Sequence, residues 1–202
     1  MNRQLTLDSG VKVGVDVDLP ASIETDPENQ GAFSDPMTGT LATHAGHGTF
    51  IAGLLRQICP DSVITVLRIM GANGVVPEDV LTSSISALAV HQQEQRKQDR
   101  ALTDALVLSL GYYSETTEDE VYTAGLLNLL VALAERGVTT FAAAGNDSTT
   151  RKSFPAAFAT QQPFGGKDIC PLVSVAALNP DRTVALFSND GNWVTAHDLG
   201  AN

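Results

Sequence analysis

The chain has 202 residues, of which 43% are apolar and 17% are charged, a composition typical of a globular domain with its own core. Its 12 Lys and Arg residues are outnumbered by 23 Asp and Glu residues, which gives a net charge of −11 at pH 7. This charge works against binding a phosphate backbone or an anionic membrane surface, so we expect neither nucleic acid nor membrane partners. We predict a single domain over residues 1–202.

The ends and the cysteines of the chain exclude other classes. No apolar signal core follows Met1, and the longest apolar stretch, Leu126–Ala134, is too short to span a bilayer. We therefore expect a soluble chain without an export signal, and the sequence does not indicate a compartment. Cys59 and Cys170 lack C-x-x-C spacing, which argues against a zinc knuckle. We predict two buried thiols and leave one disulfide open.

Short apolar runs of strand type alternate along the chain with segments of helical period. This alternation predicts an α/β fold in three layers, in which a mostly parallel twisted sheet carries helices on both faces. The predicted strands are Gln4–Leu7, Val63–Ile69, Ala105–Ser109, Thr139–Ala143, Leu172–Ala176 and Val184–Phe187.

The helix between the second and third strands is marked by Pro77 and an acidic first turn. Leu81, Ile85 and Leu88 follow at a spacing that places them on one face. We expect this face to cover the sheet.

The next helix precedes the strand Thr139–Ala143. Thr117 with Glu120 fits a capping box at its start, and Gly137 is placed to end it. Its predicted apolar stripe consists of Leu127, Leu130, Val131 and Ala134.

The stretch G-H-G-T-F-I-A-G begins at Gly46 and places His47 at the start of a helix. An imidazole at this position feels the positive end of the helix dipole, which disfavours its charged form. A carboxylate partner is therefore needed if His47 is to carry a proton during a reaction.

The first predicted strand ends in Asp8-Ser9-Gly10. A carboxylate there lies at the carboxyl edge of a parallel sheet, where the sites of α/β proteins form. Asp8 is our candidate partner of His47. Asp16 and Asp18 are rivals on a similar strand-like pattern, but neither is followed by Ser-Gly.

The strand Thr139–Ala143 leads into a Gly145-Asn146 turn. A fixed side-chain amide at this edge can stabilise the oxyanion of an acyl-transfer intermediate. The alternative interpretation is that Asn146 serves only as a turn residue that tolerates a left-handed backbone.

Four motifs occur in a fixed order: D-S-G, G-H-G-T-x-x-A-G, S-L-G and A-A-G-N. Together they resemble the successive signatures of the subtilisin-like (subtilase) serine peptidases, and Phe154-Pro155-Ala156 also matches a landmark of that family. The resemblance implies that Asp8 orients the histidine, that His47 is general base and acid, and that Asn146 is an oxyanion donor.

The same resemblance implies a substrate. It assigns Ser109, Leu110 and Gly111 to an edge segment whose backbone pairs with an extended peptide. The implied activity is proteolysis by a serine endopeptidase, and the implied partner is a polypeptide.

The family's nucleophile segment, G-T-S-x-A-x-P, has no counterpart here. The serines after Asn146 are Ser148, Ser153, Ser174 and Ser188. None of them stands at a small-residue helix start, the context of a sharp nucleophile turn. We therefore expect a domain that is incomplete at its C-terminus and inactive by itself. The alternative hypothesis is a non-catalytic peptidase-like module that binds extended peptides.

No cofactor is indicated. The strand and helix alternation alone would permit a nucleotide-binding domain, but no G-x-G-x-x-G or Walker loop follows a predicted strand. His44 and His47 have H-x-x-H spacing without a third ligand, so we expect no metal there. Four acidic residues lack the regular spacing of a calcium loop, and structural calcium is left open; they are Glu24, Asp26, Glu28 and Asp35.

Overall fold

The computed structural model describes residues 3–7, 44, 46–70, 74–164 and 169–200. The chain divides into two compact units, Met1–Asp104 and Ala105–Asn202, and each is described by itself. Among the described helices, none is both long and apolar enough to cross a membrane.

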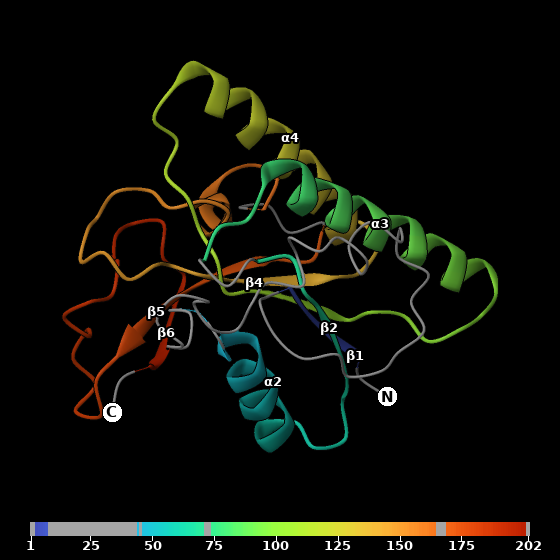
Figure 1. Ribbon diagram of the computed structural model, residues 1–202, viewed down its shortest axis with the longest axis horizontal. Helices are drawn as coiled ribbons and strands as arrows, with labels where there is room; N and C mark the ends of the chain where they lie inside the picture. The colour runs from blue at the N-terminus through green and yellow to red at the C-terminus, as the bar shows by residue number, and fades with distance from the viewer. Residues whose placement is uncertain (1–2, 8–43, 45, 71–73, 165–168, 201–202) are drawn as a thin grey trace, which may run out of the picture. The chain divides into compact units, whose positions relative to one another are not determined.

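The first unit is built on two parallel strands, β1 (Arg3–Leu7) and β2 (Val63–Leu67). Helix α2 (His47–Ile58) lies between them in sequence, and α3 (Glu78–Lys97) follows β2. The two helices lie on opposite faces of the strand pair (Figure 1). This arrangement confirms, within the first unit, the predicted sheet with helices on both faces.

Helix α3 forms where the sequence predicts it. Pro77 precedes the helix with an extended backbone, and Glu78 and Asp79 stand in the first turn, where their charges complement the helix dipole. The predicted apolar face is confirmed, because its three members are all buried: Leu81, Ile85 and Leu88.

The second unit contains four parallel strands in the order β3-β4-β5-β6. Their bounds are Ala105–Leu108, Thr139–Ala143, Leu172–Leu178 and Ala196–Leu199. Helix α4 (Thr117–Ala134) connects β3 to β4, and the 3-10 helix η1 (Ala156–Thr160) lies between β4 and β5 (Figure 1).

The capping box of α4 lies one residue earlier than predicted. Thr116, not Thr117, is the N-cap, and its Oγ1 accepts a hydrogen bond from the backbone N–H of Asp119 at 3.3 Å. The Asp119 carboxylate in turn accepts from the Thr116 N–H at 2.8 Å. The shorter Asp side chain closes the box here, so the role given to Glu120 was wrong.

The buried face of α4 also differs in part from the predicted stripe. Its buried residues are Leu126, Leu130, Leu133 and Ala134. Leu127 and Val131 lie at the margin of this face and are only partly buried. In a helix rich in leucine, several faces fit an apolar stripe, and tertiary packing selects one of them. The predicted helix stop is confirmed, since Gly137 adopts φ 90° just beyond the end of α4.

The predicted strand Val184–Phe187 was wrong. Val184 forms only an isolated antiparallel bridge to Leu178, and the chain then turns, leaving Leu186 92% exposed. The last strand is instead β6, with the polar sequence Ala-His-Asp-Leu. A strand at the end of the sheet order needs no apolar run, and hydrophobicity alone therefore missed it.

The cysteine prediction was partly wrong. Both thiols are free, Cys59 is exposed and Cys170 is partly buried. Neither cysteine belongs to the buried core, and in the second unit that core consists of aliphatic residues of α4 and the strands, together with Phe158 and Trp193.

Candidate active site

His47 is the first residue of α2, as predicted. Gly46 precedes it at φ 86°, a left-handed conformation that glycine adopts without strain, and its carbonyl accepts the first helical hydrogen bond from Phe50 N–H at 2.9 Å. Gly48 is buried while His47 is exposed. The helix therefore presents an accessible imidazole at its N-terminus.

The candidate substrate segment, Ser109–Gly111, follows β3 directly. An added Cβ at Gly111 would lie 2.6 Å from the Oγ of Ser153, so the backbone approaches this neighbour closely. Just beyond, Tyr112 and Phe154 exchange two backbone hydrogen bonds of 2.8 Å as an antiparallel bridge. The end of the segment thus lies close to Ser153, and the residue after it is paired with Phe154.

Asn146 lies in the turn after β4, and its side chain is exposed. Gly145 before it adopts φ 111°, a region that favours glycine. Because β3 and β4 are parallel neighbours with Leu108 opposite Ala142, Ser109–Gly111 and Asn146 both follow the carboxyl ends of adjacent strands. The structure brings these two predicted elements to one edge of the second unit.

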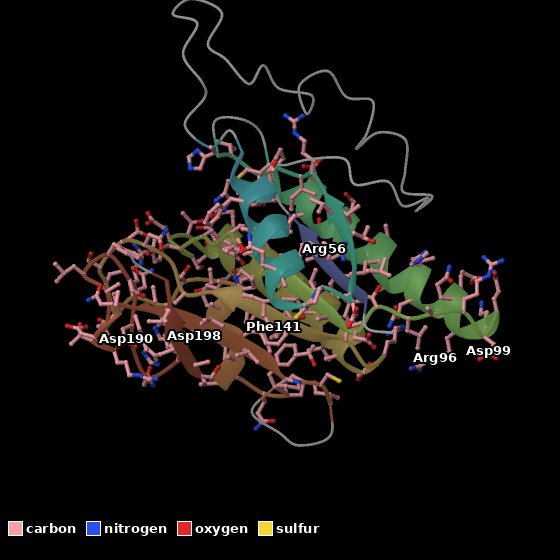
Figure 2. The ribbon with its side chains drawn as sticks, turned by 90° about the horizontal axis from the view of Figure 1, so that it is seen from below. Arg56, Arg96, Asp99, Phe141, Asp190 and Asp198 are labelled. Atoms are coloured by element: carbon pink, nitrogen blue, oxygen red, sulfur yellow. The ribbon has the colours of Figure 1, made fainter. Side chains whose placement is uncertain are left out.

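The Asn146 turn is paired along its length with a second loop, residues 186–193. Ser148 donates from its N–H to the Phe187 carbonyl at 3.0 Å and from its Oγ to the Leu186 carbonyl at 2.6 Å. Further along, the buried Trp193 indole donates to the Thr150 carbonyl at 3.2 Å. Asp190 of this loop lies at the surface of the unit (Figure 2).

Asn189 is the polar centre of this pairing, and it is fully buried at 0% exposure. Its Oδ1 accepts from the backbone N–H groups of Asp147 at 2.9 Å and Thr149 at 3.2 Å. Its Nδ2 donates to the Ala144 carbonyl at 3.0 Å and to the Tyr113 hydroxyl at 2.8 Å. Every hydrogen-bonding site of the amide is therefore used.

Tyr113 connects this network to the segment after β3. Its hydroxyl donates to the Asp147 carboxylate at 2.6 Å, and the Arg151 guanidinium lies 4.8 Å from the centre of its ring. Burial, and then the hydrogen bond to the Asp147 carboxylate, raise the pKa of Tyr113. The hydroxyl therefore stays protonated at neutral pH, as its role as donor requires.

Two predicted site residues are not part of the described second unit. Asp8 lies outside the described residues, as do its rivals Asp16 and Asp18 and the acidic residues considered for calcium. His47 belongs to the first unit and is described there. The meeting of carboxylate, imidazole and amide stays a prediction. Across the described ranges, no group of three or more His, Cys, Asp or Glu residues could hold a metal ion.

Comparison with known proteins identifies the fold. No model of a known protein family matches the chain. Subtilisin BL of Lederbergia lenta is 27% identical over 229 residues, an alignment that covers 99% of this chain and 77% of that protein. The crystal structure of a lanthipeptide protease has a TM-score of 0.66 at 21% identity. A cold adapted subtilisin-like serine proteinase has a TM-score of 0.63 at 18% identity.

The chain has a subtilisin-like fold. The two solved structures cover 99% of it, while it spans 56% and 63% of their own lengths. The predicted α/β fold with a parallel sheet is confirmed.

Asn189 and Tyr113 were not among the residues predicted from the sequence. Both lie outside the four motifs, and Ser188-Asn189-Asp190-Gly191 is typical of an ordinary turn. The sequence gives only a weak indication that Asn189 is buried, namely that it lies between the apolar residues Val184–Phe187 and Trp193. Only the structure shows that it is buried beside the candidate oxyanion donor.

Proposed function

We propose that this chain is the part of a serine endopeptidase that supplies the imidazole, its orienting carboxylate and the oxyanion donor. The observation that carries the proposal is the exposed Asn146 just beyond the carboxyl end of β4, the strand next to the one that leads into Ser109–Gly111. An amide in this place can reach the carbonyl of a peptide that pairs with that segment.

The chemistry divides among three groups. His47 takes the proton of a serine hydroxyl as it attacks the peptide carbonyl and then delivers the proton to the leaving amine. Asp8 holds the imidazole in the required tautomer and stabilises its charged form, which the helix N-terminus disfavours. Asn146 donates a hydrogen bond to the oxyanion of the tetrahedral intermediate. The substrate is a polypeptide bound in an extended conformation along Ser109, Leu110 and Gly111.

In this proposal the nucleophile is none of the serines that follow Asn146. Of the serines after Asn146, three are buried: Ser153, Ser174 and Ser188. The fourth, Ser148, is in a turn at φ 54°, and its Oγ donates to the Leu186 carbonyl. Our proposal therefore takes its serine from outside these residues, and we expect the chain by itself to hydrolyse no amide.

The first experiment uses the gene product that carries residues 1–202. A fluorophosphonate probe is expected to label one serine, and His47→Ala is expected to suppress the labelling, because the hydroxyl loses its base. A folded gene product that stays unlabelled would contradict the proposal.

The second experiment removes the oxyanion donor. Asn146→Ala is expected to lower kcat by about 10²–10³ with little change in KM, a magnitude that is known from a subtilisin and is transferred here by resemblance. Asn192→Ala is the matched control, since Asn192 is also an exposed asparagine of a turn in the second unit. Equal turnover in the two variants would refute the role of Asn146.

A second candidate function is a non-catalytic module that binds extended peptides. The close approach at Gly111 and the paired backbone of Tyr112 favour it, because both support an extended edge without any nucleophile. Isothermal titration of the chain with an unstructured peptide tests it. Peptide binding by a gene product that neither labels nor hydrolyses would favour this function over proteolysis.

A further inference from the structure

Asn146 makes a useful oxyanion donor only if its turn is held still. Transition-state stabilisation by a hydrogen-bond donor depends on a geometry fixed before the charge develops. Two residues of the turn have backbone conformations that residues with side chains rarely adopt, with φ 111° at Gly145 and φ 54° at Ser148. The groups that fix it must come from elsewhere in the fold.

The hydrogen bonds of Asn189 enclose Asn146 on both sides. Before it, the carbonyls of Ala144 and Gly145 accept from Asn189 Nδ2 at 3.0 Å and from the Asn189 backbone N–H at 2.9 Å. After it, the N–H groups of Asp147 and Thr149 donate to Asn189 Oδ1. We propose that Asn189 is the positioning residue of Asn146, an inference that rests on the proposed function.

The contacts require this side chain to be an amide. Backbone N–H groups can only donate and the Ala144 carbonyl can only accept, so Oδ1 and Nδ2 of Asn189 have one possible assignment. An aspartate would keep the two acceptor contacts and lose both donors. An alanine would lose all four side-chain contacts and leave two backbone N–H groups without this acceptor.

Asn189 also connects the Asn146 turn with the residues that follow the candidate substrate segment. Its Nδ2 donates to the Tyr113 hydroxyl, and Tyr113 stands two residues beyond Gly111. The same hydroxyl donates to the carboxylate of Asp147, directly after Asn146. One buried side chain thus sets the turn that carries the donor relative to the segment that would hold the substrate.

A double-mutant cycle in the gene product tests the inference. Asn189→Ala is expected to lower kcat by about tenfold to a hundredfold, a part of the ~10²–10³ that an oxyanion donor supplies, and to leave KM nearly unchanged. In the Asn146→Ala background the same change is expected to have almost no further effect, because the group that it positions is gone. Asn192→Ala, three residues away, is the control with wild-type kinetics.

The outcomes separate this inference from the proposed function. If Asn146→Ala leaves kcat unchanged, the proposed oxyanion role fails, and the positioning role fails with it. If Asn146→Ala lowers kcat but Asn189→Ala lowers it equally in both backgrounds, or not at all, only the present inference is overturned. Asn189→Asp, which keeps the contacts of Oδ1, is expected to fall between wild type and Asn189→Ala.

A readout without catalysis uses the 202-residue chain. The amide hydrogens of Asp147 and Thr149 are expected to exchange faster with solvent in Asn189→Ala and to stay protected in Asn189→Asp. The fluorescence of Trp193, the single tryptophan, reports whether each variant is folded. Unchanged protection of both amides in a folded Asn189→Ala would overturn the inference.

Discussion

Gly145→Ala tests whether the turn that carries Asn146 tolerates a displacement of the Asn189 side chain. The backbone at Gly145 has φ 111°, which a residue with a side chain rarely adopts. An added Cβ would also lie 2.4 Å from Nδ2 of Asn189, far inside van der Waals contact. The substitution therefore strains the backbone and displaces the side chain that holds the turn.

The magnitude follows from these two effects. A non-glycine residue in such a conformation costs about 1–3 kcal/mol. Moving Nδ2 breaks the hydrogen bonds to the Tyr113 hydroxyl at 2.8 Å and to the Ala144 carbonyl at 3.0 Å. Each contributes about 0.5–1.5 kcal/mol, which adds roughly 1–3 kcal/mol. We expect Gly145→Ala to lower the free energy of unfolding by about 2–6 kcal/mol.

Two other glycines of the same unit serve as controls. Gly137 has φ 90°, but an added Cβ there meets nothing within 4 Å, so Gly137→Ala has the backbone strain without the collision. Gly125 lies within α4 with open space around it, and Gly125→Ala is expected to stabilise the helix by about 1 kcal/mol. The three substitutions are chemically identical and differ only in their surroundings.

The assay is urea unfolding of the 202-residue chain followed by the fluorescence of Trp193, which lies in the second unit. With a slope of about 2 kcal/mol/M, the collision term alone separates the midpoints of Gly145→Ala and Gly137→Ala by roughly 0.5–1.5 M. Equal midpoints would show that the Asn189 side chain can move aside without a loss of stability, and they would refute the reasoning about a rigid turn.

Three further predictions concern titrating groups and a helix cap. The pKa of Tyr113 is raised above its ordinary 10.0, so its contribution to stability is complete below pH 10 and is lost as pH rises through the folded pKa. Tyr113→Phe should therefore flatten the decline of the urea midpoint above about pH 10, and an unchanged decline would contradict this. Thr116→Ala, which removes the N-cap of α4, should lower stability by about 1 kcal/mol. Hydrogen bonds from the backbone N–H groups of Glu115 and Thr116 lower the pKa of Asp119. The stability that the Asp119 carboxylate contributes is therefore present above pH 3.8 and is lost as pH falls through the folded pKa. Asp119→Asn should remove this acid-side dependence of the midpoint.

The strands that the sequence predicts well are those whose side chains fill a core. Thr139–Ala143 was predicted with the bounds that the structure gives it, and Leu172–Ala176 differs only at its end. Both lie inside the strand order of the second unit and need apolar residues. At the end of that order the requirement disappears, so β6 has a polar sequence and the apolar Val184–Phe187 was taken for a strand in its place.

Residues of the candidate site also differ in how far the sequence around them determines their place. The places of His47 at a helix start and of Asn146 in a turn could be predicted because the backbone around each is determined locally, by the glycine that precedes it. The end of the strand before Ser109–Gly111 could be predicted from its short apolar run, while the substrate role of the segment is implied only by the resemblance and stays a prediction. For each of these positions, neighbouring residues carry the information.

Asn189 could not be predicted, because its contacts join parts of the chain that are remote in sequence. It is 42 residues from Asp147 and 76 residues from Tyr113. An asparagine before Asp-Gly fits a solvent-exposed turn equally well, and only burial among four partners distinguishes the two cases. The motif that contains Asn146 specifies which group can stabilise an oxyanion, while the loop that contains Asn189 determines whether that group is held in place. If the proposed oxyanion role holds, loss of the Asn189 side chain should therefore alter turnover without touching a single residue of the motif, whereas Asn192→Ala in the same loop should not.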